Sequence, residues 1–437
     1  MFKLRIVWEY IRTLVLKNRF NSREALLKWQ EKKIKRHLQW VLPRSAYYRK
    51  RFETLGIGRW RELPVSEKRD MMAEFSDFNT AQITRDEALS TALEAEQSRD
   101  FSPELRGVTV GLSSGTSGHR GLFLVSARDR AIHAGSMLAS VLPGPIWNRN
   151  RVAFFLRANS NLYSSSASSR LQFQFFDLMI PVKDHAKRLS DLNPTIVFAP
   201  PSVLIELAKL QQAGAVMIHP KRIYSVAEVL DPLDQANLER VFKQTIHQVY
   251  QCTEGFLGIT CQEGTLHLNE TSVAFQMEWI DEASGKFHPI LTDFRRRTQP
   301  MIRYLMNDIL TLRRDPCPCG SPELAIEMIE GRADDVLEFP ALSSESMVSV
   351  LPDFVRRCFL YVDSGVEEYR VYQPRPGHLE IYLQCKSAGR SVTEQEIQAE
   401  IVKLAHKFQF KIPTIEFQSE FVLPKMTKLR RVEKARP

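Results

Sequence analysis

The strongest local signal for chemistry is a loop rich in glycine and hydroxyl side chains, GLSSGTSGHRG, which spans Gly111 to Gly121 and follows an apolar run ending at Val110. Glycine lets a phosphate approach the backbone closely, and the N–H groups and hydroxyls of such a loop can donate hydrogen bonds to an anion. The Gly-x-x-x-x-Gly-Lys spacing of a Walker loop does not occur in it. The residue types fit either an anion-binding loop or a flexible turn.

Four further motifs follow the SSGTSG loop: YQCTEG at Tyr250 to Gly255, RYLMND at Arg303 to Asp308, GRADD at Gly331 to Asp335 and PKMTK at Pro424 to Lys428. In order and rough spacing the five motifs resemble the adenylate-forming superfamily. The chain resembles most closely its phenylacetate–CoA ligase-like branch, because AYYRKRFETLGI, LPVSEKRDM, APPSVLIELA and YSVAEVL also match. Five ordered motifs are far more specific than any one of them.

The resemblance implies an acid–thiol ligase that uses ATP and Mg²⁺. Such an enzyme adenylates a carboxylic acid, here expected to be an aryl acid, and passes the acyl group to the pantetheine thiol of CoA or of an acyl carrier protein. The loop residues expected to hold the β- and γ-phosphates are Ser113, Ser114, Gly115, Thr116, Ser117, Gly118 and Arg120.

The same resemblance assigns roles within the later motifs. Tyr250 is expected to stack on the adenine, Thr253 to bond the α-phosphate, and Glu254 to ligate the Mg²⁺ that neutralises the transition state. Ala227 and Glu228 of YSVAEVL are expected to contact the nucleotide. Tyr250 also fits a plain core aromatic at the end of a strand.

Three residues near the C-terminal end complete the expected site. The resemblance implies that Asp308 accepts the ribose hydroxyls, that Arg332 contacts the nucleotide, and that Asp335 is the hinge of a mobile small domain. Lys428 is the expected catalytic lysine, although a solvated tail lysine is the alternative.

The sequence departs from the family pattern at four places. These are His119 where lysine is usual, Gln251 where glycine is usual, Met306 with Asn307 where threonine and glycine are usual, and the missing glycine before Lys428. Lys425 therefore competes with Lys428. A degenerate member that binds a nucleotide or acyl group without turnover is the alternative function.

A second group of residues has the chemistry of a metal site. Cys261 and His267 are followed some fifty residues later by Cys317 and Cys319, which gives three thiolates and one imidazole, a set suited to tetrahedral structural Zn²⁺. The Cys-x-Cys pair is tighter than the usual Cys-x2-Cys, whereas comparable positions occur in some members of the resembling branch. Buried free cysteines are the alternative.

Alternating strand and helix patterns must position these motifs. From Val108 onward, short apolar runs separated by helical stretches predict an α/β fold with a largely parallel sheet; the runs are 151–156, 195–199, 222–226 and 244–250. The predicted domains are a large N-terminal adenylation domain with mixed or parallel sheets, 1–333, and a small α+β C-terminal lid, 334–437. Within the first lie a basic helical front, 1–60, and a nucleotide-binding body, 108–333.

The lid and the front carry more detailed predictions. In the lid we expect a hairpin of strands 369–373 and 378–384, a helix 393–408 begun by Thr393 with Glu396 in capping-box spacing, and a strand 415–422. In the front, 21–48 predicts a basic amphipathic helix ended near Pro43. Its basic face is either solvated or a membrane-surface or partner contact.

The composition is that of an ordinary globular protein, because 43% of the 437 residues are hydrophobic and 25% are charged. The net charge of +9 is uneven: residues 1–60 carry +12 and residues 421–437 carry +5, which leaves −8 for the middle. This distribution counts against a nucleic-acid groove. The basic ends instead offer a docking surface for an acidic acyl carrier protein.

The chain shows no sign of integral membrane association or of disulfides. Its most apolar N-terminal stretch, LRIVWEYIRTLVL, is interrupted by Glu9 and Arg12, so we expect neither a signal peptide nor a membrane span. Six cysteines predict reduced thiols and a cytoplasmic location. Aromatic side chains that fit either an aryl-acid pocket or the core are Phe154, Phe155, Tyr163, Phe173, Phe175 and Phe176.

Overall fold

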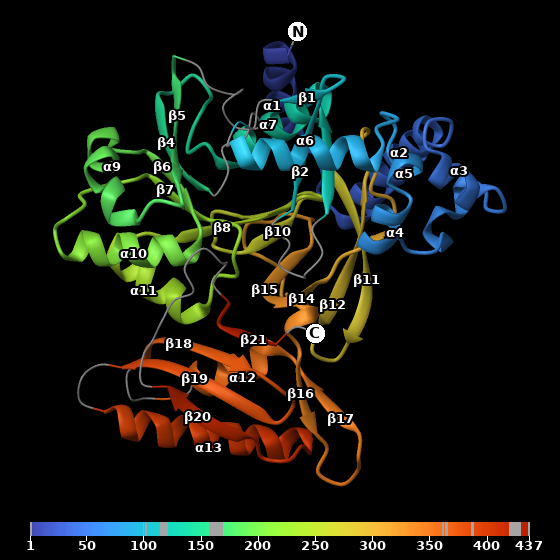
Figure 1. The fold of residues 1–437 in the computed structure, drawn as a ribbon. Helices are drawn as coiled ribbons and strands as arrows, with labels where there is room; N and C mark the ends of the chain where they lie inside the picture. The colour runs from blue at the N-terminus through green and yellow to red at the C-terminus, as the bar shows by residue number, and fades with distance from the viewer. Residues whose placement is uncertain are drawn as a thin grey trace. The chain divides into compact units, whose positions relative to one another are not determined.

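The computed structural model describes residues 2–98, 100, 103–113, 121–156, 169–360, 362, 366–385, 389–418 and 430–435 (Figure 1). The chain forms two compact units. The larger comprises Met1–Ala227, Asn237–Met306 and Thr311–Met328, and the smaller comprises Glu228–Ala236, Asn307–Leu310 and Ile329–Pro437. The predicted division into 1–333 and a mobile lid from 334 stays a prediction.

The larger unit begins with a helical front. Its elements are α1 (Phe2–Lys17), α2 (Arg23–Val41), α3 (Ala46–Phe52), η1 (Ile57–Glu62), α4 (Lys68–Ala73), α5 (Phe75–Phe78) and α6 (Arg85–Ser98). The basic helix predicted to end near Pro43 is confirmed as α2, which ends at Val41. A separate helix, α3, follows, and the Ser45 hydroxyl caps it by accepting from the Tyr48 amide at 3.4 Å.

The predicted parallel sheet is confirmed in the middle of the larger unit. Neighbouring strands β5 (Leu171–Asp177), β4 (Asn150–Leu156), β6 (Ile196–Ala199), β7 (Arg222–Ser225) and β8 (Ile246–Cys252) run parallel in that order. The helical connections between them are η2 (Val182–His185), α9 (Ala186–Leu192), α10 (Pro201–Gln212) and α11 (Pro232–Phe242). The apolar runs seen in the sequence are these buried strands.

Beyond β8 the same sheet continues. The next strands are β9 (Gly255–Thr260), β10 (Leu266–Leu268), β15 (Ala325–Arg332), β14 (Asp308–Leu312), β12 (Lys286–Asp293) and β11 (Val273–Asp281), and β13 (Tyr304–Leu305) pairs with β12. The pairs β8–β9, β9–β10, β10–β15 and β11–β12 are antiparallel. Gly258 lies where β9 meets β10, and a Cβ there would lie 2.7 Å from the His267 carbonyl oxygen. The close approach of these two strands therefore requires glycine.

A small second sheet precedes the main one along the chain. It consists of β1 (Glu104–Leu105), β2 (Val108–Leu112) and β3 (Leu122–Ser126), and the helix α7 (Ala127–Val141) follows it directly. The buried face of α7 packs in one apolar cluster with α1 and with the parallel strands. Helix α7 thus links the N-terminal helix to the sheet (Figure 1).

The smaller unit is α+β, as predicted. Its C-terminal elements are η3 (Ala333–Asp335), β16 (Leu337–Pro340), β17 (Met347–Val350), α12 (Pro352–Leu360), β18 (Val366–Gln373), β19 (His378–Cys385), α13 (Arg390–Phe408), β20 (Thr414–Gln418) and β21 (Val432–Lys434). The order of the four-stranded sheet is β20-β19-β18-β21, and β18 and β19 form the predicted hairpin. The core includes Phe359 stacked on Tyr369, with ring centroids 4.2 Å apart.

One detail of the smaller unit was predicted wrongly. Helix α13 begins at Arg390, not at Thr393, and the Thr393 hydroxyl donates to the Gly389 carbonyl at 3.0 Å instead of accepting from a capped amide. A threonine in the first turns can bond backward to a carbonyl, which the spacing to Glu396 does not reveal.

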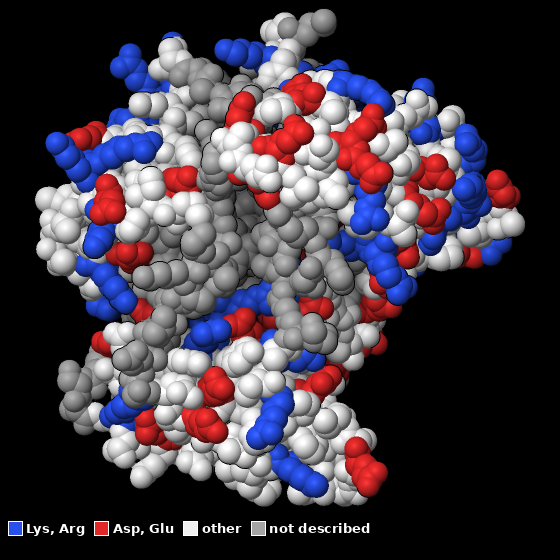
Figure 2. Space-filling view, viewed as in Figure 1, with Lys and Arg blue, Asp and Glu red and all other residues white. Residues whose placement is uncertain are grey.

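Two surface properties bear on function. No helix among the described residues is long and apolar enough to cross a membrane. Figure 2 shows Lys and Arg interspersed with Asp and Glu over the visible surface, without a continuous basic band.

The contact between α1 and α7 depends on a glycine in the middle of a helix. A Cβ at Gly135 would lie 2.6 Å from both the Glu9 Cβ and the Ile6 carbonyl oxygen. The Thr13 and Ser136 hydroxyls lie 3.3 Å apart along the same contact. Glycine in a helix interior is about 1 kcal/mol less stable than alanine. At Gly135 the close packing of α1 on α7 offsets this cost.

We therefore expect Gly135→Ala to lower the free energy of unfolding by about 1–3 kcal/mol, because α1 must move away from α7. Urea unfolding measures this change. The matched control is Gly58→Ala, since a Cβ at Gly58 meets nothing within 4 Å. A stabilisation of the Gly135→Ala variant, which helix propensity alone would give, would show that the packing argument is wrong.

Candidate active site

The predicted phosphate loop is closed at its base by a pair of hydrogen bonds. The Ser113 amide donates to the Gly121 carbonyl at 2.7 Å, and the Gly121 amide donates to the Ser113 hydroxyl at 2.7 Å. The other predicted loop residues lie outside the described part of the chain: Ser114, Gly115, Thr116, Ser117, Gly118, His119 and Arg120. Because β2 and β3 are antiparallel, they carry the loop as a hairpin end.

A lysine that the sequence analysis did not single out lies beside this loop base. A Cβ on Gly121 would come within 2.8 Å of the Lys68 Cε and 3.7 Å of its Nζ. Lys68 belongs to the LPVSEKRDM segment, which contributed to the family resemblance but was assigned no role in the site. It brings a positive charge to a loop whose own usual lysine is replaced by His119.

The second motif forms the turn between two antiparallel strands. Tyr250 is buried in β8, and Thr253 and Glu254 connect β8 to β9. The Thr253 hydroxyl donates to one Glu254 carboxylate oxygen at 2.9 Å, and the Tyr304 hydroxyl lies 3.4 Å from the other. Burial, and then the charge of Glu254, raise the pKa of Tyr304 well above its usual value, so the phenol stays protonated.

A buried arginine, Arg296, forms a hydrogen bond with the backbone of this turn. The Arg296 guanidinium donates to the Thr253 carbonyl at 2.5 Å, to the Gln299 side chain at 2.8 Å and to the Leu124 carbonyl at 3.3 Å. Leu124 lies in β3, the strand that leaves the phosphate loop. One guanidinium therefore binds both the Thr253 turn and the strand that supports the loop. The sequence analysis missed Arg296, although FRRRTQP places three arginines in a row between apolar segments.

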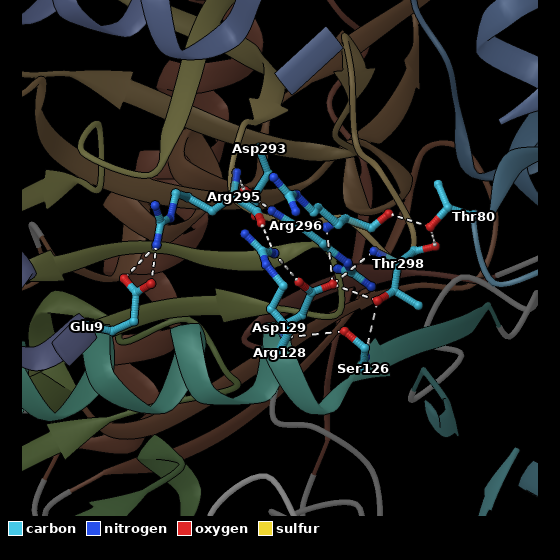
Figure 3. A network of polar contacts seen from close by, with 10 residues as sticks. Glu9, Thr80, Ser126, Arg128, Asp129, Asp293, Arg295, Arg296 and Thr298 are labelled. Carbon is cyan, nitrogen blue, oxygen red and sulfur yellow. Dashed lines mark hydrogen bonds and ion pairs between the residues drawn. The ribbon is translucent and has the colours of Figure 1, made fainter. Parts of the chain in front are cut away.

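Arg296 belongs to a larger buried polar network (Figure 3). The Asp293 carboxylate accepts from the Arg295 and Arg296 amides at 2.7 and 2.9 Å. The Arg295 guanidinium donates to both oxygens of Glu9 in α1, at 2.5 Å. Burial lowers the pKa of Arg295, and the charge of Glu9 opposes that shift.

The network also fixes the start of α7. The Asp129 carboxylate accepts from the Thr298 amide at 2.9 Å and from the Thr298 hydroxyl at 2.7 Å (Figure 3). The same hydroxyl accepts from the Ser126 amide at 3.2 Å. Backbone and side-chain bonds thus join α1, β3, α7 and the segment after β12 into one support for the Thr253 turn.

Ala227, a predicted nucleotide contact, has an unusual backbone conformation. Its φ is +68°, in the left-handed region that alanine adopts only at a cost of about 1–2 kcal/mol. Such strain is concentrated at ligand sites. No spacing rule in the sequence predicts it.

The smaller unit contains two of the other predicted nucleotide residues together. The Arg332 Nε lies 3.6 Å from an Asp308 carboxylate oxygen, and the two side chains are 34% and 14% exposed. Glu228 also lies in this unit. Lys425 and Lys428 lie outside the described residues.

Asp335, the predicted hinge, forms a buried ion pair in the smaller unit. The Arg430 guanidinium donates to the Asp335 carboxylate at 2.6 Å, and both side chains are mostly buried. Arg430 follows the PKMTK motif by two residues. The first described residue after the motif is therefore paired with the segment that the sequence predicts as the hinge.

The predicted metal ligands come together in the larger unit. The side-chain donor atoms of Cys261, His267, Cys317 and Cys319 all lie within 4.8 Å of one another. The Cys261 and Cys317 sulfurs are 3.8 Å apart, and the Cys319 sulfur lies 3.4 Å from the His267 Nε2. The other ring nitrogen, Nδ1, lies 3.2 Å from the Glu323 carbonyl oxygen, which leaves Nε2 directed at the sulfurs.

Three sulfurs and one imidazole in this arrangement could hold a tetrahedral metal ion. Partial burial raises the pKa of Cys317, but hydrogen bonds to Thr265 and to its neighbours outweigh this and lower it to about 6. Burial and the neighbouring Cys317 raise the pKa of Cys319 to about 12. A cation would stabilise both as thiolates.

The aromatic residues after the phosphate loop fit the core better than a pocket. Phe155 and Phe176 are fully buried and stack with centroids 4.7 Å apart. Phe154 packs on Phe198 at 5.1 Å. Tyr163 lies outside the described residues. Phe173 and Phe175 are half-buried. The contacts of the buried residues give no evidence for an aryl substrate.

Solved structures with a similar fold include CoA ligases and an amide bond synthetase from Marinactinospora thermotolerans, the latter with a TM-score of 0.53 at 12% identity over 73% of this chain and 66% of that chain. A 2-hydroxyisobutyryl-CoA ligase in the postadenylation state, in complex with R3-HIB-AMP, matches with a TM-score of 0.67 at 16% identity over 94% of this chain and 89% of that chain. An anthranilate CoA ligase in complex with anthranoyl-AMP matches with a TM-score of 0.53 at 13% identity over 74% and 66%. The chain therefore shares the fold of these two ligases. The resemblance and the fold class predicted from the sequence are confirmed.

The sequence comparisons are weaker. A phenylacetate-coenzyme A ligase of Thermus thermophilus is 25% identical over 144 residues, which are 30% of this chain and 31% of that protein. The match thus spans about a third of the relative's length. No family model matches the chain.

We expect Arg296→Met to lower the free energy of unfolding by about 3–5 kcal/mol, because the Thr253 and Leu124 carbonyls and the buried Gln299 side chain would lose their charged donor. Urea unfolding measures the loss. The control is Arg297→Met: the Arg297 guanidinium lies 4.4 Å from the Trp40 ring centroid and is less buried, so it should cost under about 1.5 kcal/mol. Equal losses in the two variants would contradict the role assigned to Arg296.

Proposed function

We propose that the protein is an ATP-dependent acid–thiol ligase. It adenylates a carboxylic acid and transfers the acyl group to the pantetheine thiol of CoA or of an acyl carrier protein. The observation that carries the proposal is the Arg296 guanidinium, which binds the Thr253 turn and the strand leaving the phosphate loop at once. The fold of CoA ligases supports it.

The reaction would proceed in two balanced steps. In the first, an oxygen of the acid attacks the α-phosphorus of ATP, and pyrophosphate leaves. In the second, the thiol sulfur attacks the acyl carbon, AMP leaves with the C–O bond electrons, and the thiol proton passes to solvent. The fixed donors of the site act on the charge that develops on the phosphates.

Each described residue has a place in this scheme. Thr253 would donate its hydroxyl to the α-phosphate, and Glu254, held by Tyr304, would ligate Mg²⁺, which supplies charge neutralisation when bound. Tyr250 would stack on the adenine. Lys68 would add a cation beside the phosphate loop.

The smaller unit would supply the remaining groups. We propose that Asp308 and Arg332 bind the ribose and that Ala227 and Glu228 contact the nucleotide. Lys428 would act on the α-phosphate and the acyl carboxylate, with the smaller unit as a mobile lid hinged at Asp335. The ion pair of Asp335 with Arg430, two residues after the PKMTK motif in the sequence, supports this.

The class of acid that the enzyme adenylates is the most specific part of the proposal. An aryl acid follows from the resemblance alone, because Phe154, Phe155 and Phe176 pack in the core. A panel of aryl and aliphatic acids in ATP–pyrophosphate exchange decides it, and mass analysis of CoA and carrier-protein products identifies the acceptor.

We expect exchange with at least one acid and a loss of about 10²–10³-fold in the Lys428→Ala variant, the cost of removing one group that stabilises the transition state. Thioester formation from supplied acyl-AMP should stay near the wild-type rate. Lys425→Ala is the matched control and should retain exchange.

Three outcomes separate the alternatives. Loss of exchange in Lys425→Ala alone would assign the catalytic lysine to Lys425. Tight ATP binding without exchange for any acid would replace the ligase by a nucleotide-binding protein. Absence of both ATP binding and exchange would overturn the proposal altogether.

We further propose that Cys261, His267, Cys317 and Cys319 hold a structural Zn²⁺ ion. The donor set and its spacing within 4.8 Å support this. The ion would join the β9–β10 turn to the segment before β15. Thiolate ligands require reduced cysteines, which fits the predicted cytoplasmic location.

The purified protein is expected to contain about one zinc per chain, because a four-ligand Cys/His site binds one ion. Cys317→Ser should remove the metal and lower the melting temperature by at least about 5 °C. Elemental analysis and thermal unfolding measure these effects. Cys385→Ser, in β19 of the smaller unit, is the control and should keep the metal. A metal-free protein that takes up no zinc on dialysis would exclude the site.

A further inference from the structure

Helix α1 exposes an unusual amount of apolar surface. Its inner face is buried on α7, yet large apolar side chains also cover its outer face. With their exposed fractions they are Leu4 (74%), Val7 (43%), Trp8 (57%), Ile11 (55%), Leu14 (38%) and Val15 (60%). We call these six residues the α1 stripe.

The α1 stripe is continuous along the helix. At about 100° per residue, its members fall within roughly 120° of the helix circumference, and Leu4 to Val15 extend over roughly 16 Å. Single exposed apolar residues are normal, but a contiguous row of this length marks an interaction surface. The opposite face is fixed by Gly135 and by the Glu9–Arg295 ion pair, so the stripe cannot turn inward.

The exposed charges that α1 itself carries beside the stripe have one sign. Lys3 borders it on one side and Arg5 on the other, Arg19 follows the helix, and all three are exposed. Glu9 is the sole acidic residue among the first 23, and it is buried against Arg295. The helix therefore presents cations along both edges of the stripe to an anionic partner.

Helix α2 adds to the same cationic side. Burial, and then the charges of Arg12 and Arg36, lower the pKa of Lys33 in α2. Arg19 and Arg295 act in the same direction, so the cations of α1 and α2 lie close enough to repel one another. An anionic surface would relieve that repulsion.

We propose that the α1 stripe and its cationic border attach the protein to the surface of an anionic lipid membrane. An apolar face inserted at the level of the headgroups, flanked by Lys and Arg, is the pattern of interfacial helices. Trp8 lies toward the Arg5 edge of the stripe, where an indole would meet the headgroups. This proposal is independent of the proposed function.

Two other occupants fit less well. A second copy of the chain would bring two cationic borders together at an isologous contact, and their repulsion opposes it. Leu, Ile and Val make up five of the six stripe residues, whereas protein interface cores are enriched in aromatic residues, Met and Arg. A wide aliphatic stripe fits fluid lipid better than a shaped protein pocket.

Cosedimentation of the full chain with vesicles tests the proposal. The protein should bind vesicles of phosphatidylcholine containing phosphatidylglycerol at low salt, bind less at high salt, and bind phosphatidylcholine alone weakly. The double variant Leu4→Glu with Ile11→Glu should reduce binding to the anionic vesicles by at least about tenfold, because it removes exposed apolar area and adds like charge.

A matched control separates the stripe from general hydrophobicity and charge. Met217 and Ile180 are 69% and 46% exposed, close to Leu4 and Ile11, and lie outside α1. The double variant Met217→Glu with Ile180→Glu should keep binding within about twofold. Thermal unfolding checks that both variants fold.

Four outcomes would overturn the proposal: no binding of the wild type to anionic vesicles, equal binding to neutral vesicles at all salt concentrations, equal losses in the two double variants, or a wild-type dimer that the α1 variant converts to monomer. The last result would assign the stripe to a contact between copies. Binding of an acidic carrier protein through α1 without binding of vesicles would assign it to a protein partner.

Discussion

The larger unit depends on a set of buried charges that must be paired. Arg295 and Arg296 lie in the segment just after β12, and the carboxylates of Asp293, Asp129 and Glu9 lie around them (Figure 3). A buried ion pair adds little net stability compared with an apolar contact, but an unpaired buried charge costs several kcal/mol. The network therefore excludes arrangements in which α1, α7 or the strand β3 is displaced. It specifies the structure more than it stabilises it.

This network fixes the geometry of the candidate active site. The Thr253 turn and the phosphate loop are distant in sequence, and each alone is a strand connection that many conformations could satisfy. Arg296 removes that freedom, because its planar guanidinium binds carbonyls on both sides. The larger unit also supplies a cation, Lys68, beside the base of the phosphate loop and a strained backbone at Ala227. Binding groups fixed in advance need not be ordered when a ligand arrives.

Sequence patterns predicted the parts that depend on local rules. The parallel strands, the β18–β19 hairpin and the gathering of Cys261 with Cys317 follow from periodicity, turn residues and ligand spacing. Arg296 and Glu9 could not be predicted in this way, because their partners are chosen by tertiary packing. The start of α13 was wrong for a similar reason: Thr393 had two hydrogen-bonding options, and the fold selected the backward one. The resemblance supplied roles that the residues alone left open.

The ion pair between Glu9 and Arg295 joins residues 286 positions apart. During synthesis at about 5–20 residues per second, α1 leaves the ribosome some 15–60 s before its partner arginine exists. Helix α7, on which the inner face of α1 packs, is synthesised earlier, so during this interval it is the Glu9 carboxylate that still lacks its partner. Chaperones or a lipid surface that cover the exposed apolar face of α1 could therefore act before the Glu9–Arg295 ion pair has formed.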